Sequence, residues 1–69
     1  MEIIYSEHAL KRMKQRGISE LEIEHILEHP TYTKKTIEGK KEAFGTVQNR
    51  NIIVIYFETE TYIKVITVM

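Results

Sequence analysis

Three residues near the start of the chain have types and a spacing suited to phosphate chemistry. His8, Arg12 and Arg16 recur every four residues, and this spacing places side chains above one another on one face of an α-helix. An imidazole exchanges protons near neutral pH, and a guanidinium holds two phosphate oxygens through parallel hydrogen bonds. A general acid or base in line with two permanent cations is therefore a combination suited to cleaving a phosphate ester.

The residues around this triplet predict two consecutive helices. Ser6 is a typical N-cap for the first helix, and Gly17 is a typical left-handed residue at its end. Ser19 and Glu22 match the capping-box pattern at the start of the second helix, and Pro30 ends it. The triplet is thus expected on the first of two short, well-delimited helices.

The rest of the chain predicts four β-strands. Residues rich in β-branched and aromatic types alternate with turn residues, which gives strands at 32–37, 41–47, 51–57 and 62–68. Short connections favour an antiparallel meander. The predicted fold class is α+β: a single domain over residues 1–69, with two N-terminal helices packed on a four-stranded antiparallel sheet in the order ααββββ.

The expected hairpin tips set the register and the two faces of this sheet. Tips at residues 49–50 and 59–60 pair Val47 with Ile52 and Val54 with Val65. The helices are expected on the face that carries small residues, which let a helix come close: Ala43, Gly45, Val47, Ile52, Val54, Tyr56, Ile63, Val65 and Thr67. The other face is too apolar to lie against water: Phe44, Ile53, Ile55, Phe57, Tyr62, Lys64, Ile66 and Val68. Such a face predicts a homodimer or a protein partner that covers it.

Two strand residues join the triplet as candidate site residues. Thr67 is expected on the face of the helices, where its hydroxyl needs a hydrogen-bond partner that His8 or Arg12 could supply. Tyr56 falls on the same face, where it either orients a substrate or packs in the core. Arg12 and Arg16 each have an alternative, structural role. Arg12 could instead form an ion pair with a glutamate in the second helix, and Arg16 could cap the carbonyls that end the first helix.

Composition and charge restrict the function further. The chain has a net charge of zero, which argues against a general nucleic-acid coat protein, yet its charges are segregated. Residues 7–16 hold four basic residues against one glutamate, and residues 34–41 repeat that balance. The chain has no cysteine, and no signal peptide or membrane span is evident, so a cytoplasmic location without membrane contact is expected.

Metal or cofactor chemistry is not indicated. His25 and His29 are four residues apart, a spacing that can chelate a metal, but no third ligand is evident. The chain also lacks a glycine-rich phosphate loop. We therefore expect no cofactor and no metal.

The pattern His8-Ala9-x-x-Arg12-Met13-x-x-Arg16-Gly17-Ile18, followed by Ser19, resembles a bacterial and archaeal family known as domain of unknown function four-two-five-eight. The resemblance continues into the last two strands, at residues 53–56 and 65–68. That family looks like an outlying relative of the RelE and barnase-like ribonucleases, which include metal-independent bacterial toxins. The resemblance implies His8, Arg12 and Arg16 as catalytic helix residues, with Thr67 and Tyr56 from the strands.

Two functions follow as hypotheses. The first is a small metal-independent endoribonuclease of toxin type, with RNA as its substrate and an antitoxin protein as its partner. The second is a non-enzymatic dimeric protein-binding module, in which His8, Arg12 and Arg16 form a structural polar network. A third reading is an RNA-binding domain that does not cleave.

Overall fold

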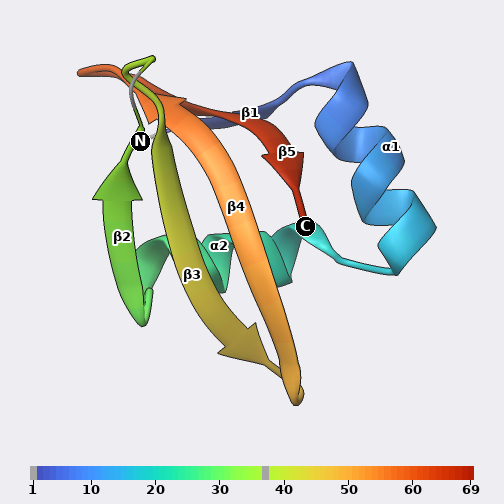
Figure 1. Cartoon of the computed structure of the whole chain (residues 1–69). Helices are drawn as coiled ribbons and strands as arrows, with labels where there is room; N and C mark the ends of the chain where they lie inside the picture. Colours follow the sequence, from blue (N-terminus) through green and yellow to red (C-terminus); the bar gives the residue numbers. More distant parts are fainter. Residues whose placement is uncertain (1, 37) are drawn as a thin grey trace.

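The computed structural model describes residues 2–36 and 38–69, which form two helices and one five-stranded sheet (Figure 1). In chain order the elements are β1 (Glu2–Tyr5), α1 (Glu7–Arg16), α2 (Glu20–Glu28), β2 (Tyr32–Lys35), β3 (Lys41–Val47), β4 (Arg50–Glu58) and β5 (Tyr62–Val68). The strands lie side by side in the order β1-β5-β4-β3-β2. The last position of the strand predicted at 32–37 lies outside the described residues.

The prediction of a four-stranded antiparallel sheet is wrong, because the sheet has a fifth strand and is mixed. β1 pairs in parallel with β5, with Ile3 opposite Ile63 and Tyr5 opposite Val65. A run of four residues is too short to display a strand period. Parallel neighbours are joined by a long crossover, so no local signal marks the pairing of the first strand with the last.

Both helices begin and end where the capping residues predict. The Ser6 hydroxyl accepts a hydrogen bond from the backbone N–H of Ala9, and Gly17 ends α1 in the left-handed region with φ of 65°. Ser19 and Glu22 form a complete capping box at the start of α2. These short-range contacts make the two helices the part of the fold that the sequence predicts best.

The β3–β4 hairpin differs from the predicted register by two residues. Gln48 and Asn49 form a two-residue turn with φ of 51° and 66°, so Val47 pairs with Arg50 rather than with Ile52. Paired left-handed residues are typical of tight hairpins, because their twist matches that of the strands. A shift of two residues keeps every side chain on its predicted face.

The β4–β5 hairpin differs by an odd number of residues in its second half. Tyr56 pairs with Val65, whereas the adjacent Ile55 pairs with Thr67, so a β-bulge leaves Ile66 as an extra residue. Beyond the bulge the faces exchange: Thr67 leaves the face of the helices, and Val68 takes its place in the core with no exposed surface. The predicted positions of Thr67 and Val68 are therefore wrong.

The core lies between the helices and one face of the sheet. Its buried residues are Ala9, Met13, Ile18, Ile23, Ile26, Ala43, Ile52, Val54, Tyr56, Val65 and Val68. The prediction that small residues mark the helix face is confirmed at Gly45. A Cβ atom at this position would lie 2.9 Å from Cγ1 of Ile26, so α2 approaches the sheet where a side chain is missing.

The opposite face of the sheet, which we call the outer face, carries apolar side chains away from the helices. Phe44, Ile53, Ile55 and Phe57 alternate with core residues along β3 and β4, and each is half-buried by its neighbours. Within residues 2–36 and 38–69, neither helix is both long enough and apolar enough to cross a membrane.

Candidate functional site

The triplet His8, Arg12 and Arg16 lies along α1 beside the buried positions of that helix. Ala9 and Met13 point into the core with 0% and 5% of their surface exposed, whereas His8 and Arg16 are exposed and Arg12 is half-buried. Throughout residues 2–36 and 38–69, no side-chain hydrogen bond or ion pair involves these three residues. The three side chains are therefore available to a ligand.

Two hydrogen bonds fix the start of α1 against the sheet. The Ser6 hydroxyl donates to the carbonyl oxygen of Ile66 at 2.8 Å and accepts from the N–H of Ala9 at 3.0 Å. The backbone N–H of Ser6 donates to the carbonyl of Val65 at 3.0 Å. Because Ile66 is the extra residue of the β-bulge, the bulge supplies the acceptor that positions the first turn of α1 and, with it, His8.

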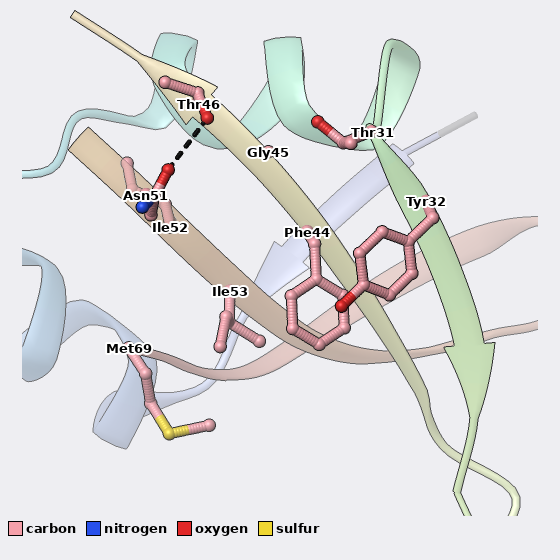
Figure 2. Close-up of a pocket in the computed structure, with 9 residues that line it drawn as sticks. All are labelled: Thr31, Tyr32, Phe44, Gly45, Thr46, Asn51, Ile52, Ile53 and Met69. Carbon is pink, nitrogen blue, oxygen red and sulfur yellow. Dashed lines mark hydrogen bonds between the residues drawn. The ribbon is translucent and has the colours of Figure 1, made fainter. Parts of the chain in front are cut away.

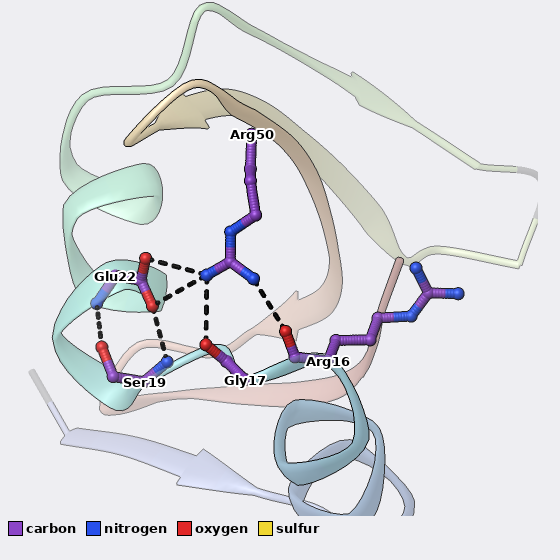
Figure 3. A network of polar contacts seen from close by, with 5 residues as sticks. All are labelled: Arg16, Gly17, Ser19, Glu22 and Arg50. Carbon is purple, nitrogen blue, oxygen red and sulfur yellow. Dashed lines mark hydrogen bonds and ion pairs between the residues drawn. The ribbon is translucent and has the colours of Figure 1, made fainter.

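Arg50 fixes the other end of α1 (Figure 3). Its guanidinium donates to the carbonyl oxygens of Arg16 at 2.7 Å and of Gly17 at 3.1 Å. The same group pairs with the Glu22 carboxylate at 3.1 Å. Arg50 thus satisfies carbonyls that the helix end leaves unpaired and ties them to the first turn of α2.

Glu22 is the anionic centre of this network. Its carboxylate accepts a hydrogen bond from the backbone N–H of Ser19 at 2.8 Å. That bond is the main reason why the pKa of Glu22 lies below its usual value of 4.5, and the hydrogen bond from Arg50 acts in the same direction. The predicted partners differ from those observed: Arg50, and not Arg12, pairs with the second helix, and Arg50, and not the Arg16 side chain, caps the first.

Thr67 lies on the outer face, where the structure separates it from the triplet. It stands opposite Ile55 in the β4–β5 pair, and cross-strand partners project to the same side of a sheet. The helices lie on the other side. The expected contact between Thr67 and His8 or Arg12 is therefore absent from the described residues, because the bulge at Ile66 moves the Thr67 side chain to the opposite face of the sheet.

Tyr56 lies on the helix face, as predicted, but it is a core residue with 7% of its surface exposed. It pairs with Val65 of β5 and Lys41 of β3. Burial raises the pKa of its phenol, Glu58 adds to the rise, and Lys41 opposes it. Lys41 is itself held by Glu58 at 3.1 Å. Tyr56 supports the sheet beneath the helices and offers little surface to a substrate.

The other candidate clusters show local contacts. The rings of His25 and His29 lie with centroids 5.4 Å apart, and within the described part of the chain no group of three or more metal-binding side chains forms. Lys40 pairs with Glu38 at 3.5 Å. Lys34 lies over the ring of Phe44 at 5.7 Å from its centroid.

Sequence reasoning does not identify Arg50 as a site residue, because it falls at the hairpin tip predicted at residues 49–50. A signal was available: Arg50 is two residues before the core residue Ile52, so strand alternation places both on the helix face. An arginine on an otherwise apolar face needs acceptors, and the ends of helices supply carbonyl oxygens. The acceptors themselves could not be named without the tertiary structure.

Comparison with known proteins gives one result. No curated protein and no solved structure shows a significant match to this chain. Residues 5–69 match the family described as Domain of unknown function (DUF4258), and this span includes the triplet, both helices and the strands β2 to β5. The relationship to RelE-like ribonucleases stays a prediction. The chain, with His8, Arg12 and Arg16 in line along α1, belongs to the DUF4258 family.

Proposed function

We propose that this protein is a small metal-independent endoribonuclease whose substrate phosphates contact the triplet on α1. One observation carries the proposal: among the described residues, His8, Arg12 and Arg16 share a helix and make no side-chain hydrogen bond or ion pair, while Arg50 makes four hydrogen bonds. Cations without internal partners in line with an imidazole fit an anionic ester better than they fit a structural network.

The chemistry assigned to the triplet is transesterification within RNA. The His8 imidazole takes the proton of a ribose 2′-hydroxyl, the 2′-oxygen forms a bond to phosphorus, and the bond from phosphorus to the 5′-oxygen breaks. The departing 5′-oxygen takes a proton from water, and the hydroxide that this leaves takes up the proton held by His8. Arg12 and Arg16 hold the non-bridging oxygens as negative charge develops on them. The products are a 2′,3′-cyclic phosphate and a 5′-hydroxyl.

Thr67 and Tyr56 have no part in this step. The proposal assigns catalysis to α1 alone, with the Ser6 and Arg50 contacts as its supports. The family resemblance suggests an antitoxin protein as the partner. The proposal also includes a cytoplasmic location, since RNA is abundant there and the chain has no cysteine.

The test is incubation of the purified protein with labelled total RNA in EDTA. Wild type should cleave and leave cyclic-phosphate ends, and His8→Ala should not cleave. His25→Ala is the matched control, because it removes an exposed histidine from the other helix. Thermal melting of each variant shows whether it is folded. Equal cleavage by His8→Ala, or no cleavage by wild type, contradicts the proposal.

The outer face supports a second candidate function, a dimeric protein-binding module. Its half-buried side chains, Phe44, Ile53, Ile55 and Phe57, form an apolar surface on the side of the sheet away from the helices. Sedimentation of wild type and Ile55→Glu tests it. A wild-type dimer that the variant converts to monomer supports a module that self-associates through this face, and a monomeric wild type contradicts it.

A further inference from the structure

A row of four side chains crosses the outer face from the edge strand β2 to the residue that follows β5. Tyr32 pairs with Phe44, and Phe44 pairs with Ile53. The backbones of Ile53 and Met69 exchange two hydrogen bonds of 2.9 Å. Figure 2 shows the four side chains across neighbouring strands. We call them the cross-strand row.

The β2 end of the cross-strand row is aromatic and cationic. The Tyr32 and Phe44 rings stack with centroids 4.3 Å apart and planes 13° apart. Lys34 lies over the Phe44 ring, and 54% of the Tyr32 surface is exposed. An exposed aromatic ring beside an ammonium group is the arrangement on which single-stranded nucleic acids stack their bases.

A hollow of about 360 Å³ lies along the cross-strand row, and the polar side chains that line it include Thr46 and Asn51. Its volume falls within the range of small-ligand sites, roughly 300–1,000 Å³. The Thr46 hydroxyl donates to Oδ1 of Asn51 at 2.9 Å, which leaves the amide nitrogen of Asn51 to donate to a ligand. An amide beside a stacking ring can hydrogen-bond the edge of an unpaired base.

The hollow continues toward α1. A second hollow is lined by Arg16 and Arg50 and shares Asn51, Ile52 and Met69 with the first. A continuous surface therefore runs from the basic end of α1 to the stacked rings, with Arg16 at one end and Lys34 at the other. Cations at both ends of an apolar and aromatic path complement a polyanion with planar bases.

We propose that this surface binds single-stranded RNA, with an unpaired base stacked on Tyr32 while the phosphates of the same strand contact Arg16 on α1. The inference rests on the proposed function and deepens it, because it adds a base-binding subsite to the phosphate-binding triplet. In this proposal the ligand that covers the outer face near Tyr32 is a base of single-stranded RNA.

The test compares two dye-labelled 2′-O-methyl oligonucleotides of equal length by fluorescence anisotropy. One carries bases and the other is abasic, and neither has the 2′-hydroxyl that cleavage needs. Wild type should bind the base-bearing strand about tenfold more tightly than the abasic one. Tyr32→Leu should lose this difference and still bind the abasic strand as wild type does. Leu21→Ala, which changes an exposed apolar residue on α2, is the matched control and should leave both affinities unchanged.

A second variant gives a direct readout of stacking. The chain contains no tryptophan, so Tyr32→Trp introduces a single indole that retains a stacking surface. Its fluorescence should be quenched by the base-bearing strand and not by the abasic strand. This measurement does not depend on how well Tyr32→Leu folds.

The contrary outcomes separate the inference from the proposed function. If wild type binds neither strand, both fail. If wild type binds the two strands equally and Tyr32→Leu changes neither affinity, the phosphate contact at α1 stands and the base subsite is overturned. If Tyr32→Leu instead converts a dimer to a monomer without any effect on RNA binding, the face binds a second copy and the inference is wrong.

Discussion

The Ser6 hydroxyl donates a hydrogen bond of 2.8 Å to the carbonyl oxygen of Ile66, sixty positions away in the sequence. The same hydroxyl caps α1 by accepting from the N–H of Ala9. Ile66 is the extra residue of the β-bulge in β5, so its carbonyl is turned out of the regular ladder toward the helix. One side chain thus joins the start of the candidate site to the irregular point of the sheet.

Replacement of Ser6 by alanine should lower the free energy of unfolding by about 1–2 kcal/mol, because it removes an N-cap and leaves the Ile66 carbonyl without its donor. Chemical denaturation measures the change. Ser6→Thr retains the hydroxyl and should lose much less. Equal losses for the two variants would show that the hydroxyl does not carry the effect.

Glu22 should make the stability of the protein depend on pH in the acid range. Its pKa is lowered in the fold, chiefly by the hydrogen bond from the backbone of Ser19. The contribution of Glu22 to the free energy of unfolding is therefore present above its usual pKa of 4.5, and it is lost as the pH falls through the lowered pKa. Unfolding curves of wild type and Glu22→Gln, taken from pH 7 to pH 3, should converge at the acid end.

Glu28→Gln provides the control for that comparison, because Glu28 is exposed on the same helix and its replacement changes the net charge equally. The free energy of unfolding of Glu28→Gln should change with pH in parallel with that of wild type from pH 7 to pH 3. If Glu22→Gln also remains parallel, the carboxylate does not stabilise the junction between α1 and α2.

Gly45 should tolerate no side chain while Ile26 lies above it. A Cβ atom at this position would meet Cγ1 and Cγ2 of Ile26 at 2.9 and 3.1 Å, so Gly45→Ala should cost about 1–3 kcal/mol through overpacking. Ile26→Ala alone should cost about 2–5 kcal/mol through the cavity that it leaves. The double variant should lose less than the two single losses together, and strict additivity would contradict the contact.

Tyr5 should affect stability at alkaline pH and not near neutrality. Its hydroxyl is buried without a hydrogen-bond partner among the described residues. Burial, with the nearby charges of Glu20 and Glu24, raises its pKa to about 12. The fold favours the neutral phenol, and this preference contributes to the free energy of unfolding. The contribution is present below the pKa of about 10 that the phenol has in the unfolded chain, and it is lost as the pH rises toward 12.

Tyr5→Phe should therefore match or exceed wild type in stability at pH 7, since no hydrogen bond is lost, and it should lose less stability than wild type between pH 10 and pH 12. Tyr32→Phe removes an exposed phenol and serves as the control. A marked loss for Tyr5→Phe at pH 7 would show that the hydroxyl has a partner.

The sequence predicted those parts of the fold that depend on near neighbours. The caps at Ser6 and Gly17 and the capping box at Ser19 are local patterns, and the structure confirms them. The face of the helices could be inferred from Gly45, because a missing side chain is itself a local sign of close approach. The triplet on α1 follows from the same short-range periodicity.

The parts that were predicted wrongly depend on residues far apart in the chain. No local sequence pattern marks the pairing of β1 with β5. None marks the bulge at Ile66 either, because the carbonyl of that residue accepts a hydrogen bond from Ser6, which lies at the other end of the chain. That single extra residue moved Thr67 to the other face of the sheet. Arg50 was missed for a similar reason, since its acceptors belong to another element.

The parallel pairing of β1 with β5 has a consequence for the order in which the chain can fold during its synthesis. β1 is the first strand made, yet its partner is Tyr62–Val68, the last strand of the fold. The acceptors for Ser6 at the start of α1 belong to the same late segment. A nascent chain that lacks β5 can build the β3–β4 hairpin but cannot fix the start of α1, because closure of so long a loop must wait for its second end. The candidate site is therefore assembled only after nearly the whole fold has been translated.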